Sequence, residues 1–548
     1  MRVDEAVGAA LAELGVDRVF GLVGSGNYVV TTTLDAHGAR FVAARHESAA
    51  VCMADGYART SGRVGVASVH QGPGFTNTLT GLAEAAKSRT PLLLLAADTP
   101  AAAVHSNFRV DQAAASTAVG AVVERVSSPA SALEDVVRAY RRARDDRRTV
   151  VLLLPLDVQA AELPRRDPVA APPPPRRPAP ASDAVGAVAD LIQRARRPVV
   201  LAGRGAVLAD AAARLVALAD GMGALLATSA VANGLFAGHP YDLGISGGFS
   251  SPLAAELLAG ADLVLGFGAS LNNWTTRHGA LIAPDAAVVQ VDLDAAAIGA
   301  RQPVDLGVVA DVGEAAGSLL DELRRRGFHG QGLRSPGLAE SVARGRWRDQ
   351  PYEDASTEAT IDPRTLTIAL DDLLPADRAL TVDSGHFMGW PVMYLTVTDA
   401  RAFVFNQAFQ AVGLGLGAAI GSAVAAPPGR VTVAALGDGG TFLSLGELET
   451  AARLRLPLLV LVYNDDAYGA EVHHFADYGA GLDLVRFPET DIAALGRAAG
   501  ADGATVRRPQ DLKAVESWLT RRDRPLVVDA KITPTVVAEW LQEAFRGG

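Results

Sequence analysis

Two groups of polar residues in the last third of the sequence have the types and spacing to bind a phosphate and a metal. Gly437-Asp438-Gly439-Gly440 follows the apolar run 431–436, and Asn464-Asp465-Asp466 follows the apolar run 457–463. If both runs are neighbouring parallel strands, their carboxyl ends lie at the same sheet edge, where ligands bind. Glycines let the backbone approach a phosphate, and aspartate oxygens are ligands that Mg²⁺ prefers. The pattern predicts a magnesium-diphosphate site, whereas a lone glycine group would predict only a tight turn.

The segment between these groups, and the rest of the chain, must position them. Leu445, Leu448 and Ala452 lie on one face of a predicted helix, which gives a strand-helix-strand unit of the parallel kind. Further apolar runs alternate with helical patterns along the chain, at 18–22, 41–44, 64–69, 91–96, 149–154, 197–202, 261–267, 287–292, 379–382 and 525–529. We therefore expect an α/β protein of three doubly wound domains with mainly parallel sheets.

Shifts in composition mark the expected domain boundaries. Residues 163–182 are rich in proline, which lacks a backbone donor, and this predicts an extended linker. Residues 331–362 form a polar, arginine-containing connection. The predicted domains are therefore 1–162, 183–330 and 363–548. The last of them ends in a tail, 536–545, whose apolar residues have helical spacing.

The overall composition excludes several classes of protein. The formal net charge is −11, and a nucleic-acid-binding surface needs clustered Lys and Arg. Cys52 is the only cysteine, so neither an internal disulfide nor a zinc site of several thiolates can form. No apolar run approaches the roughly 20 residues that span a bilayer, and the N-terminus lacks the pattern of a signal peptide. We expect a cytoplasmic enzyme or binding protein without nucleic-acid or membrane partners.

Asp438 and Asp465 are 27 positions apart, and this motif resembles the signature of thiamine diphosphate enzymes. The segments ARHESAAVCMADGYAR, VHQGPGFTN, VVLLLPLDVQ and VVQVDLDAAAIG are similar to the acetolactate synthase and 2-oxo acid decarboxylase branch. The resemblance thus covers nearly the full length, and it implies the order pyrimidine domain, middle domain and diphosphate domain. It also implies a cofactor held between the first domain of one subunit and the third domain of its partner, and hence a homodimer or homotetramer.

The resemblance implies a set of cofactor and metal contacts. Asp438, Asp465 and the carbonyl of Ala467 would bind Mg²⁺, with Asp465 where an asparagine is usual; Asn464 as the ligand is an alternative. The carbonyl of Gln410 would receive the amino group of the cofactor, and Val412 would hold the cofactor bent. The other residues expected around the diphosphate and its metal are Ser384, Gly385, His386, Gly437, Gly439, Gly440, Thr441 and Tyr468.

Glu47 matches the glutamate that, in this family, hydrogen-bonds the aminopyrimidine ring of the cofactor. A carboxyl group at a ring nitrogen favours the imino tautomer, whose exocyclic nitrogen can remove the thiazolium proton and create the nucleophile. That nucleophile attacks the carbonyl of a 2-oxo acid, and carbon dioxide departs. Without the flanking motif, Glu47 would be interpreted as a solvated acid favoured by the dipole at a helix start.

Ser25, His70 and Gln71 lie in loops at predicted strand ends of the first domain, where a substrate would meet the cofactor. A histidine at this place resembles benzoylformate decarboxylase, in which it relays protons; a hydrogen-bonded turn residue is the alternative for His70. The run 107–112 departs from the Phe-Gln-Glu run of acetolactate synthases, which puts acetolactate as the product in doubt. Three further residues are candidates for substrate contact: Phe108, Arg109 and His473.

We predict a thiamine diphosphate- and Mg²⁺-dependent enzyme that decarboxylates a 2-oxo acid and joins the product to a second carbonyl compound, such as an aldehyde or another 2-oxo acid. The alternative is a non-ligating decarboxylase or a lyase of the benzoylformate decarboxylase type. A catalytically silent cofactor-binding protein is a further alternative, against which Glu47 and Asp438 speak. FAD is not expected, because residues 268–274 differ from the flavin-binding run of the family. Gly203-Arg204-Gly205 weakly suggests a dinucleotide loop, and a plain strand-to-helix turn explains it at least as well.

Overall fold

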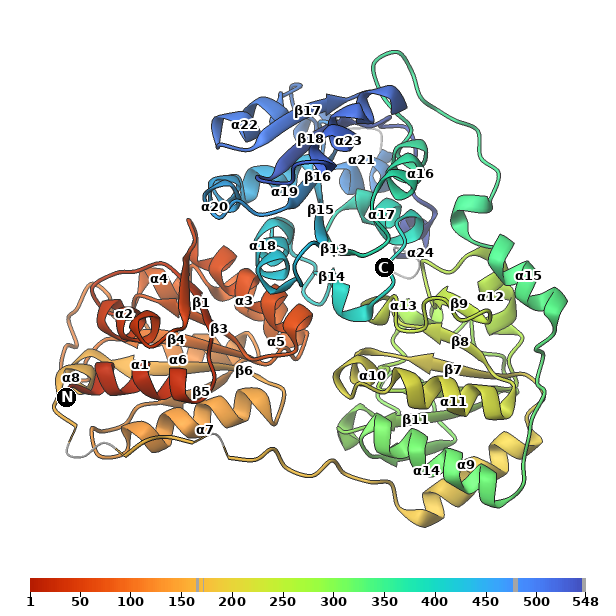
Figure 1. Cartoon of the computed structure of the whole chain (residues 1–548), viewed down its shortest axis with the longest axis horizontal. Coiled ribbons are helices and arrows are strands. Elements are labelled where there is room, and N and C mark those ends of the chain that lie inside the picture. The colour runs from red at the N-terminus through yellow and green to blue at the C-terminus, as the bar shows by residue number, and fades with distance from the viewer. Residues whose placement is uncertain (164–166, 171, 477–480, 545–548) are drawn as a thin grey trace.

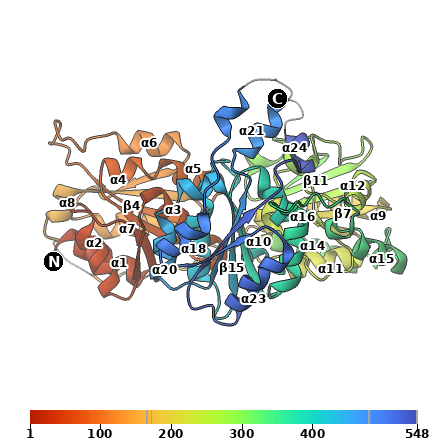
Figure 2. The same ribbon diagram turned by 90° about the horizontal axis from the view of Figure 1, so that it is seen from above.

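Three α/β domains, each built on a six-stranded sheet, make up the computed structural model, which describes residues 1–163, 167–170, 172–476 and 481–544 (Figure 1). Neighbouring strands pair in parallel in all three sheets. This confirms the fold class expected from the sequence. Seen from above, the third domain lies between the first and the middle domain (Figure 2).

The first domain carries the strands β1 (Arg18–Gly21), β2 (Arg40–Ala43), β3 (Gly65–Val69), β4 (Leu92–Asp98), β5 (Val122–Arg125) and β6 (Thr149–Pro155). Its helices are α1 (Val3–Glu13), α2 (Tyr28–Ala36), α3 (Glu47–Ser61), α4 (Pro73–Thr76), α5 (Leu79–Lys87), α6 (Gln112–Ala118), α7 (Ala132–Arg144) and α8 (Leu156–Ala160). The strand order is β2-β1-β3-β4-β6-β5. Strands β3, β4 and β6 are buried throughout, because helices cover both faces of a parallel sheet.

The middle domain carries the strands β7 (Pro198–Ala202), β8 (Leu225–Thr228), β9 (Asp242–Ile245), β10 (Leu263–Phe267), β11 (Ala287–Asp292) and β12 (Leu306–Val309), in the order β12-β11-β10-β7-β8-β9. Its helices are α9 (Ser182–Arg194), α10 (Arg204–Leu208), α11 (Ala212–Met222), α12 (Pro252–Ala259), α13 (Asn273–Thr276) and α14 (Val312–Arg325). Gly203 and Gly205 pack tightly here: a Cβ on either would lie within 2.7 Å of the backbone of Gly268. The two glycines are therefore required by a strand-to-helix turn.

The third domain carries the strands β13 (Arg378–Val382), β14 (Phe403–Phe405), β15 (Val431–Gly437), β16 (Leu458–Asn464), β17 (Asp502–Val506) and β18 (Leu526–Lys531), in the order β14-β13-β15-β16-β18-β17. Its helices are α16 (Pro363–Leu373), α17 (Gly389–Tyr394), α18 (Gly415–Ala425), α19 (Asp438–Leu443), α20 (Glu447–Arg453), α21 (Gly469–His474), α22 (Ile492–Ala498), α23 (Lys513–Leu519) and α24 (Glu539–Ala544). β15 pairs directly with β16. The two polar groups found in the sequence therefore follow adjacent strands.

The first and third domains pack through α3 and α18. A Cβ on Gly56 would lie 2.0 Å from the carbonyl oxygen of Ala418, and one on Gly421 would lie 1.9 Å from that of Met53. Thr60 donates its hydroxyl hydrogen to Ser422 Oγ across the same contact (2.9 Å). The small residues let the two helices approach closely, so this contact fixes the first domain on the third.

The connecting segments only partly match their predicted character. In the proline-rich segment, the described residues 172–180 form no helix or strand. The connection 331–362 contains a helix, α15 (Pro336–Arg344), whose Val342 packs in a core cluster of the middle domain. The predicted tail helix forms as α24, while Phe545 lies outside the described residues.

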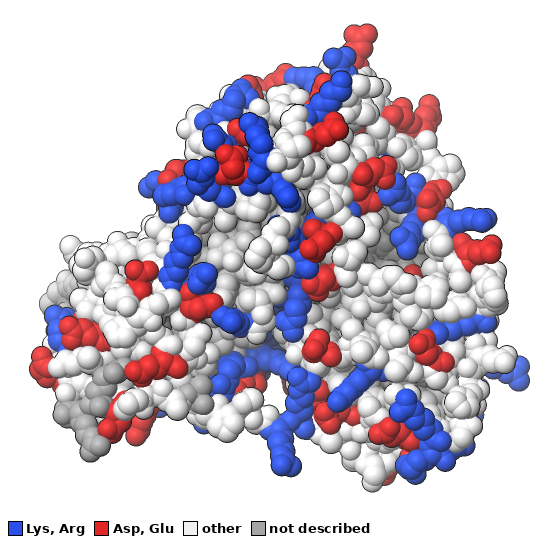
Figure 3. Space-filling view, in the orientation of Figure 1, with Lys and Arg blue, Asp and Glu red and all other residues white. Residues whose placement is uncertain are grey.

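No helix in the described ranges is long and apolar enough to cross a membrane. On the face shown in Figure 3, acidic and basic side chains are interspersed over all three domains.

Candidate active site

The glycine loop that is predicted to bind the diphosphate, called the diphosphate loop below, follows the carboxyl end of β15. The strand ends at Gly437, and α19 begins at Asp438. Space is tight here: a Cβ on Gly440 would lie 2.4 Å from a buried carboxylate oxygen, and one on Gly439 would lie 2.6 Å from a tyrosine ring. The loop therefore needs both glycines. Thr441 is buried and donates its hydroxyl hydrogen to the Gly437 carbonyl (2.8 Å), so its side chain is turned back into the helix.

Asp438 and Asp465 lie at the ends of the adjacent strands β15 and β16. The Oδ2 atom of Asp438 accepts a hydrogen bond from the backbone N–H of Ala467 (3.1 Å), which holds the two loops together. Burial raises the pKa of Asp438 to about 7. Burial, together with the nearby Asp438 carboxylate, raises the pKa of Asp465 to about 8. Two buried acids that repel each other are a favourable place for a divalent cation, which would offset both costs.

Asn464, the alternative metal ligand, uses its side chain elsewhere. Its Nδ2 atom donates to Asp529 Oδ1 (2.8 Å), and its Oδ1 atom accepts from the backbone N–H of Asp466 (3.0 Å). The residue is also buried. This geometry favours Asp465 over Asn464 as the ligand that reaches the loop of Asp438.

A second loop of the site follows β13 and includes Ser384, Gly385 and His386. Ser384 Oγ donates to the side chain of Gln407 (3.3 Å) and is 3.4 Å from the carbonyl oxygen of Gln410. His386 accepts a hydrogen bond at Nε2 from the backbone N–H of Ala538 in the C-terminal segment (2.9 Å). Burial lowers the pKa of His386 to about 3. The ring is therefore neutral, and its remaining proton is on Nδ1.

The turn that carries Gln410 and Val412 is held from two sides. The buried Asp383 carboxylate accepts hydrogen bonds from three consecutive backbone N–H groups, 413–415, at 2.9 to 3.2 Å. Glu84, on α5 of the first domain, accepts two more from the start of the same turn, at 2.7 and 3.3 Å. Val412 is left exposed at the loop surface. Asp383 and Glu84 were both missed in the sequence, although Asp383 directly follows the apolar run 379–382.

One cavity of about 1410 Å³ joins these loops and extends to the middle domain and the C-terminal segment. Its middle-domain wall includes Arg204 and Asp292, and Trp540 lines it from the C-terminal segment. His473 is partly buried outside this lining, with its ring centroid 4.3 Å from that of His386. The predicted residues that line the cavity are Ser384, Gly385, His386, Gln410, Val412, Gly437, Asp438, Gly439, Gly440, Asp465, Ala467 and Tyr468.

The donor set of this cavity fits a magnesium diphosphate. Among the described residues, no group of three His, Cys, Asp or Glu side chains could hold a metal ion. A metal at Asp438 and Asp465 would therefore need other oxygen donors, such as the backbone carbonyl of Ala467 and the oxygens of a bound phosphate. In the same part of the chain, the buried Nε2 atom of Gln407 has no protein partner and lines the cavity. It is available to a ligand.

The first domain holds the other predicted catalytic residues at the carboxyl edge of its sheet. Glu47 is the first residue of α3, and its Oε2 atom accepts a hydrogen bond from Asn77 (3.0 Å). Asn77 was missed as a site residue, although it ends the VHQGPGFTN segment. Ser25 Oγ and His70 Nε2 are 3.2 Å apart, and His70 Nδ1 is 2.8 Å from the Gln71 carbonyl oxygen. Because a carbonyl can only accept, Nδ1 carries the proton, and in the neutral ring Nε2 accepts from Ser25.

The remaining first-domain candidates differ in exposure. Phe108 is exposed, and the edge-to-face contact of its ring with His70 has a centroid distance of 5.1 Å. Arg109 follows it on the same exposed loop. Gln71 is buried, and in the described part of the chain its Oε1 atom lacks a partner. The structure therefore brings Ser25, His70 and Phe108 together, while Gln71 is buried.

The two sets of residues are separate within one chain. The cavity of the third domain is lined by Asp438 and Asp465 but by none of Ser25, Glu47 and His70. Large apolar side chains are exposed beside both sets: Leu443 is 67% exposed next to the diphosphate loop, and Tyr28 is 57% exposed near Ser25. The first-domain set therefore lies outside the cavity that Asp438 and Asp465 line.

Family models match all three domains. They are described as the thiamine pyrophosphate enzyme N-terminal binding domain, at residues 1–118, the central domain, at 185–319, and the C-terminal binding domain, at 383–530. Thiamine pyrophosphate is another name of thiamine diphosphate. The matches agree with the order of domains expected from the sequence.

Similar proteins cover almost the whole chain. A sulfoacetaldehyde acetyltransferase of Rhodobacter capsulatus is 31% identical over 555 residues, which cover 93% of this chain and 90% of the relative. A probable 2-ketoarginine decarboxylase, AruI, of Pseudomonas aeruginosa is 32% identical over 533 residues, which cover 93% of this chain and 90% of the relative. An acetolactate synthase large subunit of Parasynechococcus marenigrum is 28% identical over 547 residues, which cover 96% of this chain and 85% of the relative. The chain therefore belongs to the thiamine pyrophosphate enzyme family.

Proposed function

We propose that the chain decarboxylates a 2-oxo acid with thiamine diphosphate and Mg²⁺ and transfers the remaining group to a second carbonyl compound. The observation that carries this proposal is the cavity of about 1410 Å³, which continues from the diphosphate loops to the middle domain. Ligand sites commonly occupy roughly 300–1,000 Å³, so this cavity has room for a cofactor and two reactants. Relatives named acetyltransferase or acetolactate synthase support the same proposal.

The third domain would bind the charged end of the cofactor. Asp438, Asp465 and the carbonyl of Ala467 would hold Mg²⁺, and the backbone of the glycine loop would approach the diphosphate. The neutral ring of His386 offers its Nδ1–H as a donor on the same wall of the cavity. Bound thiamine diphosphate would supply the electron sink for loss of carbon dioxide.

The first domain would supply the proton chemistry. Glu47 is the first residue of α3, and Asn77 donates a hydrogen bond to one of its oxygen atoms. This leaves the other oxygen, Oε1, to exchange a proton with the pyrimidine ring. His70 and Ser25 form a hydrogen-bonded pair that can deliver a proton to, or accept one from, a bound substrate.

A complete site requires a second copy of the chain. Glu47 and Asp438 belong to separate half-sites in one chain, and both halves are bordered by exposed apolar side chains. In a two-fold symmetric dimer, the same surfaces meet twice, so two equivalent sites would form. We infer a homodimer, or a tetramer built from such dimers, in which each site takes one half from each subunit.

A specific observation favours the second candidate, a simple decarboxylase. The Ser25–His70 pair is arranged for proton relay, and protonation of the decarboxylated product would release an aldehyde. One relative is named a probable decarboxylase. The two candidate reactions use the same cofactor. They differ only in whether the decarboxylated intermediate reacts with a second carbonyl compound or with a proton.

A product assay separates the candidates. The purified protein, loaded with thiamine diphosphate and Mg²⁺, is incubated with a panel of 2-oxo acids, with and without aldehydes, and the products are identified by mass. A 2-hydroxyketone or a 2-hydroxy-2-alkyl-3-oxo acid is the expected product. Aldehyde as the sole product across the panel would favour the decarboxylase, and no consumption of any 2-oxo acid would refute both.

A further inference from the structure

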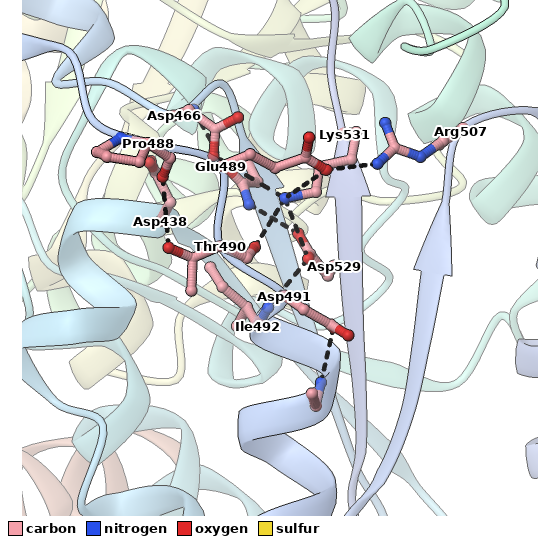
Figure 4. Close-up of polar contacts among 12 residues, drawn as sticks. Asp438, Asp466, Pro488, Glu489, Thr490, Asp491, Ile492, Arg507, Asp529 and Lys531 are labelled. Carbon is pink, nitrogen blue, oxygen red and sulfur yellow. Dashed lines mark hydrogen bonds and ion pairs between the residues drawn. The ribbon is translucent and has the colours of Figure 1, made fainter.

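A buried lysine lies next to the loop that carries Asp465. Lys531 ends strand β18, and its side chain is 4% exposed. Its ammonium group donates a hydrogen bond to the carbonyl oxygen of Thr490 (2.8 Å), and it lies 3.3 Å from Asp529, 3.8 Å from Glu489 and 3.9 Å from Asp466 (Figure 4). Lysine is almost never buried unless it is paired, so these contacts account for its position.

The contacts of β18 hold both ends of one turn. Asp529 accepts a hydrogen bond from Asn464, the residue before Asp465 (2.8 Å). Lys531 reaches Asp466, the residue after it (3.9 Å). Asp529 and Lys531 are two positions apart in a strand, so their side chains lie on the same face of the sheet. The backbone of Asp466 has a φ of 52°, in the left-handed region, which makes this a sharp turn that needs such support.

The turn also concentrates negative charge. Asp466 directly follows Asp465, and its carboxylate acts electrostatically on Asp438 and Asp465, the two carboxylates of the proposed metal site. Within the described ranges, Lys531 is the one cationic side chain that forms an ion pair with any of the three. Glu489 has a second cation, because Arg507 lies 2.5 Å from it. Among the described residues, neither Asp466 nor Asp529 forms an ion pair with a second cation.

We propose that Lys531 is a positioning residue for the metal-binding turn. Its ammonium group offsets the charge of Asp466 and fixes the turn, so that the Asp465 carboxylate and the Ala467 carbonyl bind Mg²⁺. The inference rests on the magnesium site of the proposed function and deepens it.

The affinity for Mg²⁺ tests this role directly. MgCl₂ is titrated calorimetrically into full-length protein that is saturated with thiamine diphosphate. We expect Lys531→Met to weaken Mg²⁺ binding roughly 10–100-fold, the usual effect of removing a group that supports metal ligands. Lys513→Met, which removes an exposed lysine on α23, is the matched control and should bind like the wild type.

The Asp466→Asn background distinguishes positioning from general stabilisation. If Lys531 acts by offsetting the charge of Asp466, then Lys531→Met should lower the Mg²⁺ affinity of the Asp466→Asn variant by less than about threefold. The reason is that the effects of substitutions at two coupled residues do not add. An equal loss in both backgrounds would overturn the proposal. So would unchanged Mg²⁺ affinity with a lower melting temperature, which is the result expected of an ordinary core ion pair.

Two further controls complete the test. If Lys531→Met does not fold, Lys531→Gln replaces it, because glutamine keeps a donor for the Thr490 carbonyl and removes only the charge; the same weakening is expected. A wild-type protein that binds no Mg²⁺ in the presence of thiamine diphosphate would refute the magnesium site itself. A wild type that binds it, with unchanged affinity in the Lys531 variants, would refute this inference alone.

Discussion

Two inactive variants are expected to restore activity when they assemble with each other. Glu47→Gln removes the acid of the first-domain half-site, and Asp438→Asn removes a carboxylate of the third-domain half-site. One chain does not bring these residues to the same cavity. In a mixed dimer, one site would take Glu47 from one subunit and Asp438 from the other, both intact, while the second site would receive both substitutions.

The size of the effect follows from the number of sites. Random assembly makes about half of the dimers mixed, and each mixed dimer has one intact site of two, so co-produced subunits should show about a quarter of wild-type activity. Mixed dimers purified through two different affinity tags should show about half. Activity is measured as carbon dioxide release from the 2-oxo acid that the product assay identifies, and each variant alone provides the background.

A different result is expected if the subunits do not share their sites. If each site were complete within one chain, every site in the mixed dimer would carry one substitution, and purified mixed dimers would show only background activity. That result would refute the shared site. Retention on both affinity resins in succession shows that mixed dimers were present, so a failure to assemble is distinguished from a failure to complement.

Three further predictions concern single steps. Glu47→Gln should abolish turnover while thiamine diphosphate still binds in calorimetry; unchanged turnover would contradict the proposed proton chemistry. Burial raises the pKa of Asp438 to about 7 and that of Asp465 to about 8, so the metal-free fold loses stability as pH rises through this range, and Mg²⁺ binding must displace protons. The increase in melting temperature caused by Mg²⁺ with thiamine diphosphate should therefore grow between about pH 6 and about pH 8.5, and a constant increase would argue against these ligands. Gly440→Ala would place a Cβ 2.4 Å from a carboxylate oxygen, and the resulting strain of roughly 1–3 kcal/mol should weaken cofactor binding about tenfold or more; Gly337→Ala, where a Cβ meets nothing within 4 Å, is the control, and equal affinities would contradict the tight loop.

The part of the site that could be predicted from the sequence lies at strand ends. Asp438 and Asp465 were predicted to lie close together because parallel strands end at one sheet edge, and the structure places their strands side by side. Ser25 and His70 were predicted as candidates in the same way, and the structure places them in a hydrogen-bonded pair. In a regular parallel sheet, residues that follow strands far apart in the sequence lie at the same edge. These predictions therefore required no knowledge of contacts between other side chains.

The supporting contacts could not be predicted, because they join segments that are far apart in the sequence. Glu84 accepts a hydrogen bond from Phe409, 325 positions later. Ala538 donates to His386 across 152 positions. The sequence holds no local signal for such pairs, since a buried glutamate or a backbone N–H has no periodic pattern. The helix within the connection 331–362 was missed for a related reason: its apolar side is short, and Val342 acquires a partner only in the folded middle domain.

The C-terminal segment lines the cavity that we propose as the active site. Helix α24 has six residues, too few to be stable alone, so tertiary packing must determine where it lies. Trp540 supplies that packing: its ring lies 5.7 Å from Trp274 and 6.1 Å from Phe249, both in the middle domain, and it lines the cavity. Two positions earlier, Ala538 fixes the tautomer of His386 on the diphosphate wall. Because one short segment contacts both walls, the position of the middle domain and the orientation of the His386 ring are physically linked.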